Sequence, residues 1–283
     1  MVGLTCWREQ IPFLVQLGYR VIVPTLRGFG ETDAPTESSA YGDKTISNDF
    51  AALLDHLEIP TVVVIGHDWG GQAAWRFTQF YPDRVVGVAS FCTPYIVPEQ
   101  QYHSVEDVVK ILPNFTYQLH LITPEAAKEI DENTEAFFKR IFRRVTETKN
   151  LGGIIDKTTG TLIAGRPPVD KSDSLPQKVL DYYVEKYQKR GAAGGLNFYK
   201  RRKTSFEECK NLDPIINKPA LMVTADGDAA LPPALTHGME NYIPQLERGA
   251  ITGAGHWVLW EKPDECNAYL KNWLSKIYPV NKL

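Results

Sequence analysis

The sequence predicts an α/β fold in which helices flank a mostly parallel β-sheet. Three observations support this prediction. Val62-Val63-Val64-Ile65 is a continuous β-branched run, typical of a parallel strand that is buried on both faces. Expected strands alternate with expected helices over residues 1–94 and again over 214–283. Residues 95–213 show mainly helical spacing, so we expect a helical lid over the carboxyl ends of the strands, where such sheets bind ligands.

The first series of elements follows from local patterns. Apolar residues on one face predict a helix over 7–17, which Gly18 would end. A strand is expected over 19–24, and a loop with several Gly and Pro residues over 27–35. An amphipathic helix over 44–57 follows the 3.6-residue period and precedes the strand over 62–65. A helix over 70–80 and a buried strand over 85–91 complete the series.

The later part of the chain gives the insertion and the rest of the sheet. Helical spacing predicts helices over 104–112, 124–145 and 176–190, and a loop rich in Gly, Thr and Pro covers 151–173. The α/β pattern then resumes with a strand over 219–225, a helix over 233–242, a short strand over 249–252 and a final helix over 263–277. We therefore expect two core segments, 1–94 and 214–283, separated by the lid.

Composition excludes several classes of function. A net charge of −3 over 283 residues gives no sign of nucleic-acid binding, which favours clustered Lys and Arg. The sequence has neither an apolar run of about 20 residues nor a signal-peptide pattern, so we expect no membrane association. Four scattered cysteines without a Cys-x-x-Cys pair fit a reducing compartment and a cytoplasmic location. Asn281-Lys282-Leu283 is a weak variant of a peroxisomal signal.

The buried strand leads into Gly66-His67-Asp68-Trp69-Gly70-Gly71, which has the form of a nucleophile elbow with aspartate at its apex. We expect Gly66 and Gly70, which have no Cβ, to let strand and helix approach closely. The following helix would keep Asp68 ionised, and a carboxylate can attack an electrophilic carbon without a base. The alternative for Asp68 is an ordinary helix N-cap.

Two further polar segments follow expected strands of the same sheet. Asp226-Gly227-Asp228 follows the strand over 219–225, and Gly255-His256-Trp257 follows the strand over 249–252. The chain order is nucleophile, acid, histidine. His256 would act as a general base on water, and Asp226 or Asp228 would orient its imidazole. The other aspartate would be a turn residue.

Six stretches spread over nearly the whole chain match one family, and they are Arg27-Gly28-Phe29-Gly30-Glu31-Thr32-Asp33-Ala34-Pro35, Gly66-His67-Asp68-Trp69-Gly70-Gly71, Phe115-Thr116-Tyr117-Gln118-Leu119, Leu196-Asn197-Phe198-Tyr199, Thr224-Ala225-Asp226-Gly227-Asp228 and Gly255-His256-Trp257. The chain resembles a soluble epoxide hydrolase of the α/β-hydrolase superfamily. The resemblance implies that Asp68 is the nucleophile, Asp228 rather than Asp226 the acid, and His256 the base. It also implies two lid tyrosines, Tyr117 and Tyr199.

The resemblance implies a two-step reaction. Asp68 would attack an epoxide carbon while Tyr117 and Tyr199 polarise the ring oxygen and supply a proton. His256 would then activate water to hydrolyse the ester, and a vicinal diol would leave. The backbone N–H of Trp69 would supply half of an oxyanion hole. The expected partners are a small apolar epoxide and water, with no metal or organic cofactor, in a monomer or homodimer.

The sequence departs from this family at its beginning. The family carries a His-Gly-x-Pro segment that provides the other oxyanion donor, and this sequence starts with Met1-Val2-Gly3, after the position of that segment. We therefore expect that the sequence is N-terminally truncated and that the first strands of the sheet are absent. A central strand would then be missing, which predicts low stability and weak activity.

Two alternatives stay open. A haloalkane or haloacid dehalogenase shares the Asp-His-Asp triad, but it needs Trp or Asn donors for halide where this chain has Tyr117 and Tyr199. A non-catalytic hydrolase-like protein would also explain the missing segment, whereas the intact triad argues against it.

Overall fold

Among the residues that the structure describes, four parallel strands form one sheet in the order β1-β2-β3-β4. This computed structural model describes residues 4–150, 156 and 161–279. Ala89 in the second strand lies opposite both Ile65 and Leu221, and the register between the first two strands shifts once, between Val62 and Val63. The strands are β1 (Val62–His67), β2 (Val85–Phe91), β3 (Ala220–Ala225) and β4 (Leu246–Ile251).

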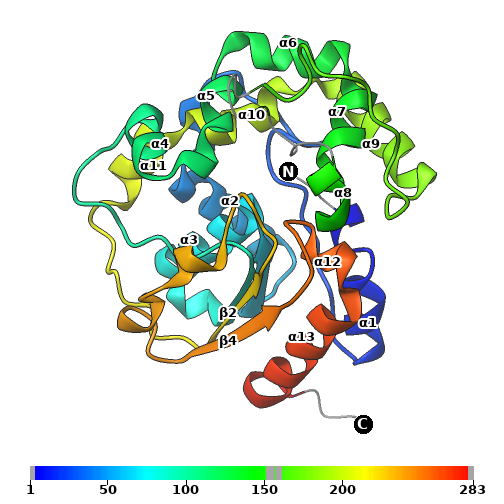
Figure 1. The fold of residues 1–283 in the computed structure, drawn as a ribbon. Helices are drawn as coiled ribbons and strands as arrows, with labels where there is room; N and C mark the ends of the chain where they lie inside the picture. The colour runs from blue at the N-terminus through cyan, green and yellow to red at the C-terminus, as the bar shows by residue number, and fades with distance from the viewer. Residues whose placement is uncertain (1–3, 151–155, 157–160, 280–283) are drawn as a thin grey trace.

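Helices cover both faces of this sheet, which makes a three-layer core (Figure 1). On one face Trp75 packs in an apolar cluster with Val88 and Met222. On the other face Trp273 belongs to a larger cluster that contains Phe91 and Val223. Alternate strand residues thus point to opposite layers, as strand geometry requires. The helices α3 (Trp69–Phe80) and α13 (Pro263–Ile277) pack on the strands, and α2 (Asp43–His56) packs beside α3 and shares an apolar cluster with β1 and β2.

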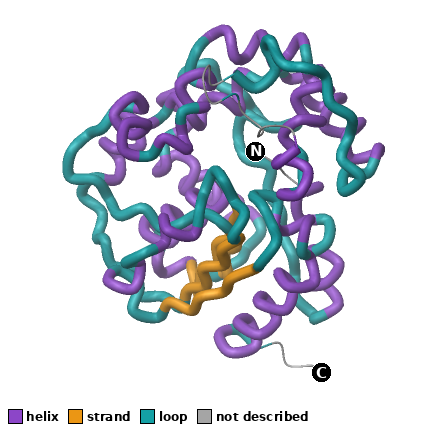
Figure 2. The backbone as a smooth tube through the Cα atoms, in the orientation of Figure 1, coloured by secondary structure: helices purple, strands orange, loops and turns teal. Residues whose placement is uncertain are grey.

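A helical segment, residues 95–213, lies in the chain between β2 and β3. Figure 1 shows its helices arching over the core, and Figure 2 shows how little of the backbone around them is strand. Its elements are α4 (Val105–Ile111), η4 (Pro113–Phe115), α5 (Tyr117–Leu121), α6 (Pro124–Glu132), α7 (Thr134–Ile141), α8 (Val145–Asn150), α9 (Gln177–Arg190), α10 (Ala193–Lys200) and α11 (Arg202–Cys209), with η denoting a 3-10 helix.

The expected strand over 19–24 is wrong, because these residues form no part of the described sheet. Within the described ranges, β1 hydrogen-bonds to β2 alone, so 19–24 has no ladder that would make it a strand. Tyr19 and Val21 nevertheless pack against the same apolar cluster as Val63 and Ile65. The local pattern therefore correctly indicated burial but not pairing.

Three expected helices are shorter or divided. The helix over 7–17 is η1 (Leu4–Trp7) followed by α1 (Gln10–Gln16), because Pro12 has no N–H and fits only the first turn. The helix over 233–242 is two 3-10 turns, η5 (Pro233–Thr236) and η6 (Met239–Asn241), separated at Gly238 with φ +79°.

The helix expected over 124–145 is divided into α6, α7 and the start of α8. It is interrupted at Asn133, whose φ of −132° is not helical, and again at Phe142, whose ψ is 80°. The loop expected over 151–173 lies partly outside the described residues, and 281–283, with the peroxisome-like ending, lie wholly outside them. Within the described ranges, no helix has the length and apolar character needed to cross a membrane.

Candidate active site

Asp68 stands at a strained turn between the end of β1 and the start of α3. Its φ of 55° and ψ of −131° are unusual for a residue with a Cβ. Asp68 occupies the N-cap position of α3, but its carboxylate makes no capping hydrogen bond to the first turn of that helix. The Thr93 hydroxyl donates to the Asp68 carbonyl oxygen at 2.9 Å and helps to hold the strained peptide. The turn thus presents the side chain of Asp68 at the carboxyl edge of the sheet.

The close approach of strand and helix depends on Gly66 and Gly71 rather than on Gly66 and Gly70. A Cβ on Gly66 would lie 2.2 Å from the Gly70 carbonyl oxygen, and one on Gly71 would lie 2.6 Å from Ser90 Oγ. A Cβ on Gly70 would meet nothing within 4 Å. The expectation for Gly70 is therefore corrected, because its α-carbon faces open space while its carbonyl group forms the contact.

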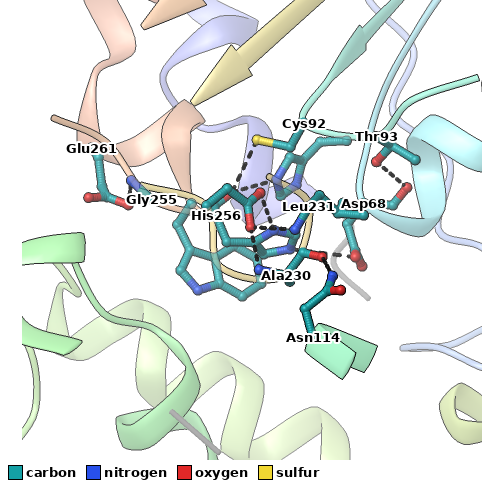
Figure 3. Close-up of polar contacts among 12 residues, drawn as sticks. Asp68, Cys92, Thr93, Asn114, Ala230, Leu231, Gly255, His256 and Glu261 are labelled. Carbon is teal, nitrogen blue, oxygen red and sulfur yellow. Dashed lines mark hydrogen bonds and ion pairs between the residues drawn. The ribbon is translucent and has the colours of Figure 1, made fainter. Parts of the chain in front are cut away.

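His256 joins two carboxylates from two other loops of the same edge (Figure 3). Its Nδ1 donates to Asp228 Oδ2 at 2.8 Å, and its Nε2 lies 3.5 Å from Asp68 Oδ2. The other Asp228 oxygen accepts the backbone N–H groups of Ala230 and Leu231, both at 2.9 Å. The structure therefore brings the nucleophile, base and acid of the sequence prediction into one chain of contacts.

Asp226 has a different role from Asp228. Its Oδ1 accepts the Gly253 N–H at 2.8 Å, which ties the turn after β3 to the turn after β4. The Asp228 side chain has no exposed surface, whereas its partner His256 is only half-buried. The acid that contacts His256 is thus Asp228.

The three titratable groups of the triad shift one another's pKa values. Burial opposes ionisation of Asp68, but its hydrogen bond to His256 and the attraction to that side chain outweigh burial, so the pKa of Asp68 lies well below its ordinary value. The same balance lowers the pKa of Asp228 to about 2. Burial opposes protonation of His256, but Asp228 first and then Asp68 raise its pKa to about 10. In the absence of substrate, His256 is therefore an imidazolium between the carboxylates of Asp68 and Asp228.

His67 supports the histidine loop from inside the elbow motif. Its Nε2–H donates to the His256 carbonyl oxygen at 2.7 Å, and the two ring centroids are 4.8 Å apart. Burial and the neighbouring His256 lower the pKa of His67 to about 4. A neutral His67 can therefore hold the loop near pH 7 without adding a second positive charge.

Tyr117 and Tyr199 come from α5 and α10, and their ring centroids are 6.1 Å apart. Burial, with the negative charge of Asp68 adding to it, raises the pKa of each phenol well above its ordinary value. Both side chains therefore stay protonated donors. Trp69, the first residue of α3, touches Tyr199 edge to face at 5.1 Å. Its backbone N–H is in the first turn of α3, where helical N–H groups have no partner within the helix.

Sequence reasoning missed two residues that tie the helical segment to the loops of the triad. The Asn114 amide donates to the Ala230 carbonyl oxygen at 2.7 Å. Glu261 accepts the N–H of Val145 at 2.9 Å and that of Gly255, next to His256, at 3.0 Å. Burial raises the pKa of Glu261. No local motif distinguishes these residues, because the contacts from Asn114 to Ala230 and from Glu261 to Val145 each join parts of the chain 116 residues apart.

The part of the chain that the structure describes contains no group of three or more His, Cys, Asp or Glu residues arranged to hold a metal ion. The four cysteines are all free and buried.

Comparison with known proteins agrees with this geometry. The sequence model of the family described as alpha/beta hydrolase fold matches residues 3–263. Bifunctional epoxide hydrolase 2 of Mus musculus is 37% identical over 95% of this chain but 49% of its own length. The chain thus spans about half the length of that relative.

Two other relatives match over most of their length. Epoxide hydrolase srdG of Neurospora crassa is 33% identical over 95% of this chain and 82% of its own length. The crystal structure of epoxide hydrolase A from Mycobacterium thermoresistibile superposes with a TM-score of 0.81 at 28% identity, over 95% of this chain and 86% of that one. The chain belongs to the α/β-hydrolase fold family, as a relative of the epoxide hydrolases.

Proposed function

We propose that this chain hydrolyses epoxides to vicinal diols through a covalent ester on Asp68. One observation carries the proposal. The nucleophile–base–acid contacts of Asp68, His256 and Asp228 occur together with two protonated phenols, buried Tyr199 and half-buried Tyr117, whose pKa values the charge of Asp68 raises further. A carboxylate nucleophile suits an electrophilic carbon, and phenol donors suit a leaving oxygen that stays attached to the product.

In the first step, one Asp68 oxygen attacks an epoxide carbon and the bond from that carbon to the ring oxygen breaks. The electron pair goes to the ring oxygen, which takes a proton from Tyr117 or Tyr199 while the other phenol donates a hydrogen bond. The products are a hydroxyalkyl ester on Asp68 and a phenolate. The low pKa of Asp68 keeps the nucleophile charged for this step.

In the second step, the proton of the His256 imidazolium first passes to the phenolate. Neutral His256 then takes a proton from water, and the oxygen of that water attacks the ester carbonyl carbon. The backbone N–H of Trp69 would stabilise the oxygen that becomes negative. When the ester bond breaks, the diol leaves with one oxygen from the epoxide and one from Asp68, and the water oxygen stays on the carboxylate. The leaving oxygen takes the second proton of the water and His256 keeps the first, so the carboxylate, the phenols and the imidazolium of the starting state are restored.

We further propose that residues 95–213 act as a lid, supported by Asn114 and Glu261, whose hydrogen bonds tie this segment to the triad loops. The small apolar character of the substrate and a monomeric or homodimeric state stay predictions. Four free, buried cysteines support a reducing compartment such as the cytoplasm.

The proposal is tested by single turnover in H₂¹⁸O with enzyme in excess over styrene oxide. The first diol should contain no ¹⁸O from the solvent, and the label should appear in the Asp68 carboxylate. Asp68→Ala should form no diol. Direct attack of labelled water on the epoxide would put ¹⁸O in the first diol and contradict the ester. Tyr199→Phe should lower epoxide turnover by about 10²-fold, whereas a dehalogenase tested on haloalkanes should hardly respond.

A further inference from the structure

A buried ion pair lies behind the proposed site, where the helical segment meets the core. Asp43, the first residue of α2, and Arg201, between α10 and α11, are each 3% exposed. Arg201 Nη1 lies 2.8 Å from Asp43 Oδ1 and also donates to the Tyr41 carbonyl oxygen at 2.7 Å. Removing both charges from water is costly, and the attraction between them offsets this cost only when their geometry is good.

The pair is part of a small buried cluster that contains a second guanidinium group. Arg76 Nε lies 3.7 Å from Asp43 Oδ2, and Cys209 Sγ lies 3.8 Å from the same oxygen. Arg76 is held separately, because its Nη1 donates to Gln79. Asp43 therefore has two guanidinium neighbours, and one of them, Arg201, also faces the rings of Phe198 and Trp69.

The other side of the Arg201 guanidinium faces aromatic rings. Its central carbon lies 4.9 Å from the centroid of Phe198 and 5.3 Å from that of Trp69. The Trp69 ring in turn meets Tyr199 at 5.1 Å with an interplanar angle of 86°. A planar, permanently charged group is thus fixed by a carboxylate on one side and supports the aromatic ring against which Tyr199 rests.

We propose that Arg201, anchored by Asp43, is a positioning residue for the epoxide-opening step. It fixes the end of α10 and the indole of Trp69 together, and so fixes where the Tyr199 hydroxyl stands relative to Asp68. This inference rests on the proposed function, because Tyr199 matters only if it donates to an epoxide oxygen. His256 receives its orientation from Asp228 and His67 instead, so the ester-hydrolysis step should not depend on Arg201.

The test measures the two steps separately in the full chain. Enzyme in excess is mixed with styrene oxide and quenched in acid at intervals, and the Asp68 ester is quantified by intact-protein mass. Arg201→Met should slow ester formation by about 10²-fold, since a misplacement of about 1 Å can cost that much. Ester hydrolysis should change less than about twofold. Arg201→Lys, which keeps the charge but loses the planar fork, should recover part of the rate.

A double-mutant cycle with Tyr199→Phe identifies the route of the effect. If Arg201 acts through Tyr199, Arg201→Met in the Tyr199→Phe background should change ester formation by less than about twofold. Arg202→Met is the matched control, because the Arg202 guanidinium pairs with Glu99 at 2.7 Å and bonds the His103 carbonyl oxygen. It should leave both steps unchanged.

Folding is controlled by a second variant. Arg201→Met alone leaves Asp43 with Arg76 as its remaining guanidinium neighbour, whereas Asp43→Asn combined with Arg201→Met removes one charge of each sign and keeps the net charge of the cluster unchanged. The combined variant should show a full ester amplitude with the slow rate constant. Equal slowing in both Tyr199 backgrounds, or a loss of amplitude with unchanged rate constants, would overturn the positioning role. A folded wild-type chain that forms no ester would overturn the proposed function as well.

Discussion

Asp228→Asn should separate the two steps of the proposed reaction. The substitution keeps the size of the side chain and changes one oxygen into an amide nitrogen. Asp228 Oδ1 accepts two backbone N–H groups, so an amide NH₂ placed there would face donors only. The amide nitrogen must therefore point at His256 Nδ1 and donate to it. The imidazole proton then resides on Nε2, the nitrogen that has to accept a proton from water.

The expected magnitude follows from this change of tautomer. A positioned general base contributes about 10²- to 10⁴-fold, and Asp228→Asn removes it without emptying the site. That loss corresponds to about 2.7–5.4 kcal/mol of barrier in ester hydrolysis. Ester formation needs only the charge of Asp68 and the two phenols, so it should stay within about tenfold of wild type. The variant should therefore stop as the covalent ester.

The assay is rapid mixing of the variant with styrene oxide, followed by acid quenching and intact-protein mass measurement. The ester should accumulate on nearly all of the protein, and peptide mapping should locate it at Asp68. Asp226→Asn is the control. Its remaining oxygen can still accept the Gly253 N–H, so its turnover should stay within about twofold of wild type. Turnover of Asp228→Asn within about tenfold of wild type, without ester, would refute the reasoning.

Two further predictions concern the elbow and the pH dependence. Gly66→Ala should lower the free energy of unfolding by about 1–3 kcal/mol, because its Cβ would lie 2.2 Å from a backbone oxygen. Gly70→Ala should leave the free energy of unfolding nearly unchanged. Chemical denaturation of both variants checks this, and equal midpoints would contradict it. The rate of ester formation should stay constant as pH falls from about 8 to 5, because the low pKa keeps Asp68 charged. Ester hydrolysis should slow as pH falls through the pKa of His256 in the ester, which lies below its value of about 10 in the free site because the ester removes the charge of Asp68. Single-turnover rates measured at each pH check this, and parallel pH profiles would contradict it.

The elements that could be predicted from the sequence are those with complete local signals. The strand over 85–91 and the helix over 263–277 have the predicted bounds, because each has an uninterrupted pattern. The strand over 19–24 failed because a strand also needs a neighbour, which no local pattern supplies. The helix over 233–242 failed at Gly238, where one left-handed residue outweighs the propensity of its neighbours.

The candidate site divides in the same way. Asp68 follows β1 directly and His256 follows β4 after a short turn, so the topology alone puts them on one edge of the sheet. Asp226 and Asp228 are two residues apart in a turn, and the residues alone left the choice between them open until the rotation of that turn was known. Arg201 and Glu261 belong to contacts between distant segments, and neither has a neighbouring residue that would have indicated its role.

The charges of the triad explain how one histidine can serve both steps in turn. Before the reaction, His256 lies between two carboxylates and its pKa is raised, so it is held as the cation that stabilises ionised Asp68. Ester formation converts Asp68 into a neutral group and removes one of those two carboxylates. Burial, which favours the neutral imidazole, is then opposed by Asp228 alone, so the pKa of His256 must fall. We infer that the ester itself lets His256 release its proton, so that a neutral imidazole is available as a base at the moment when the reaction first needs one.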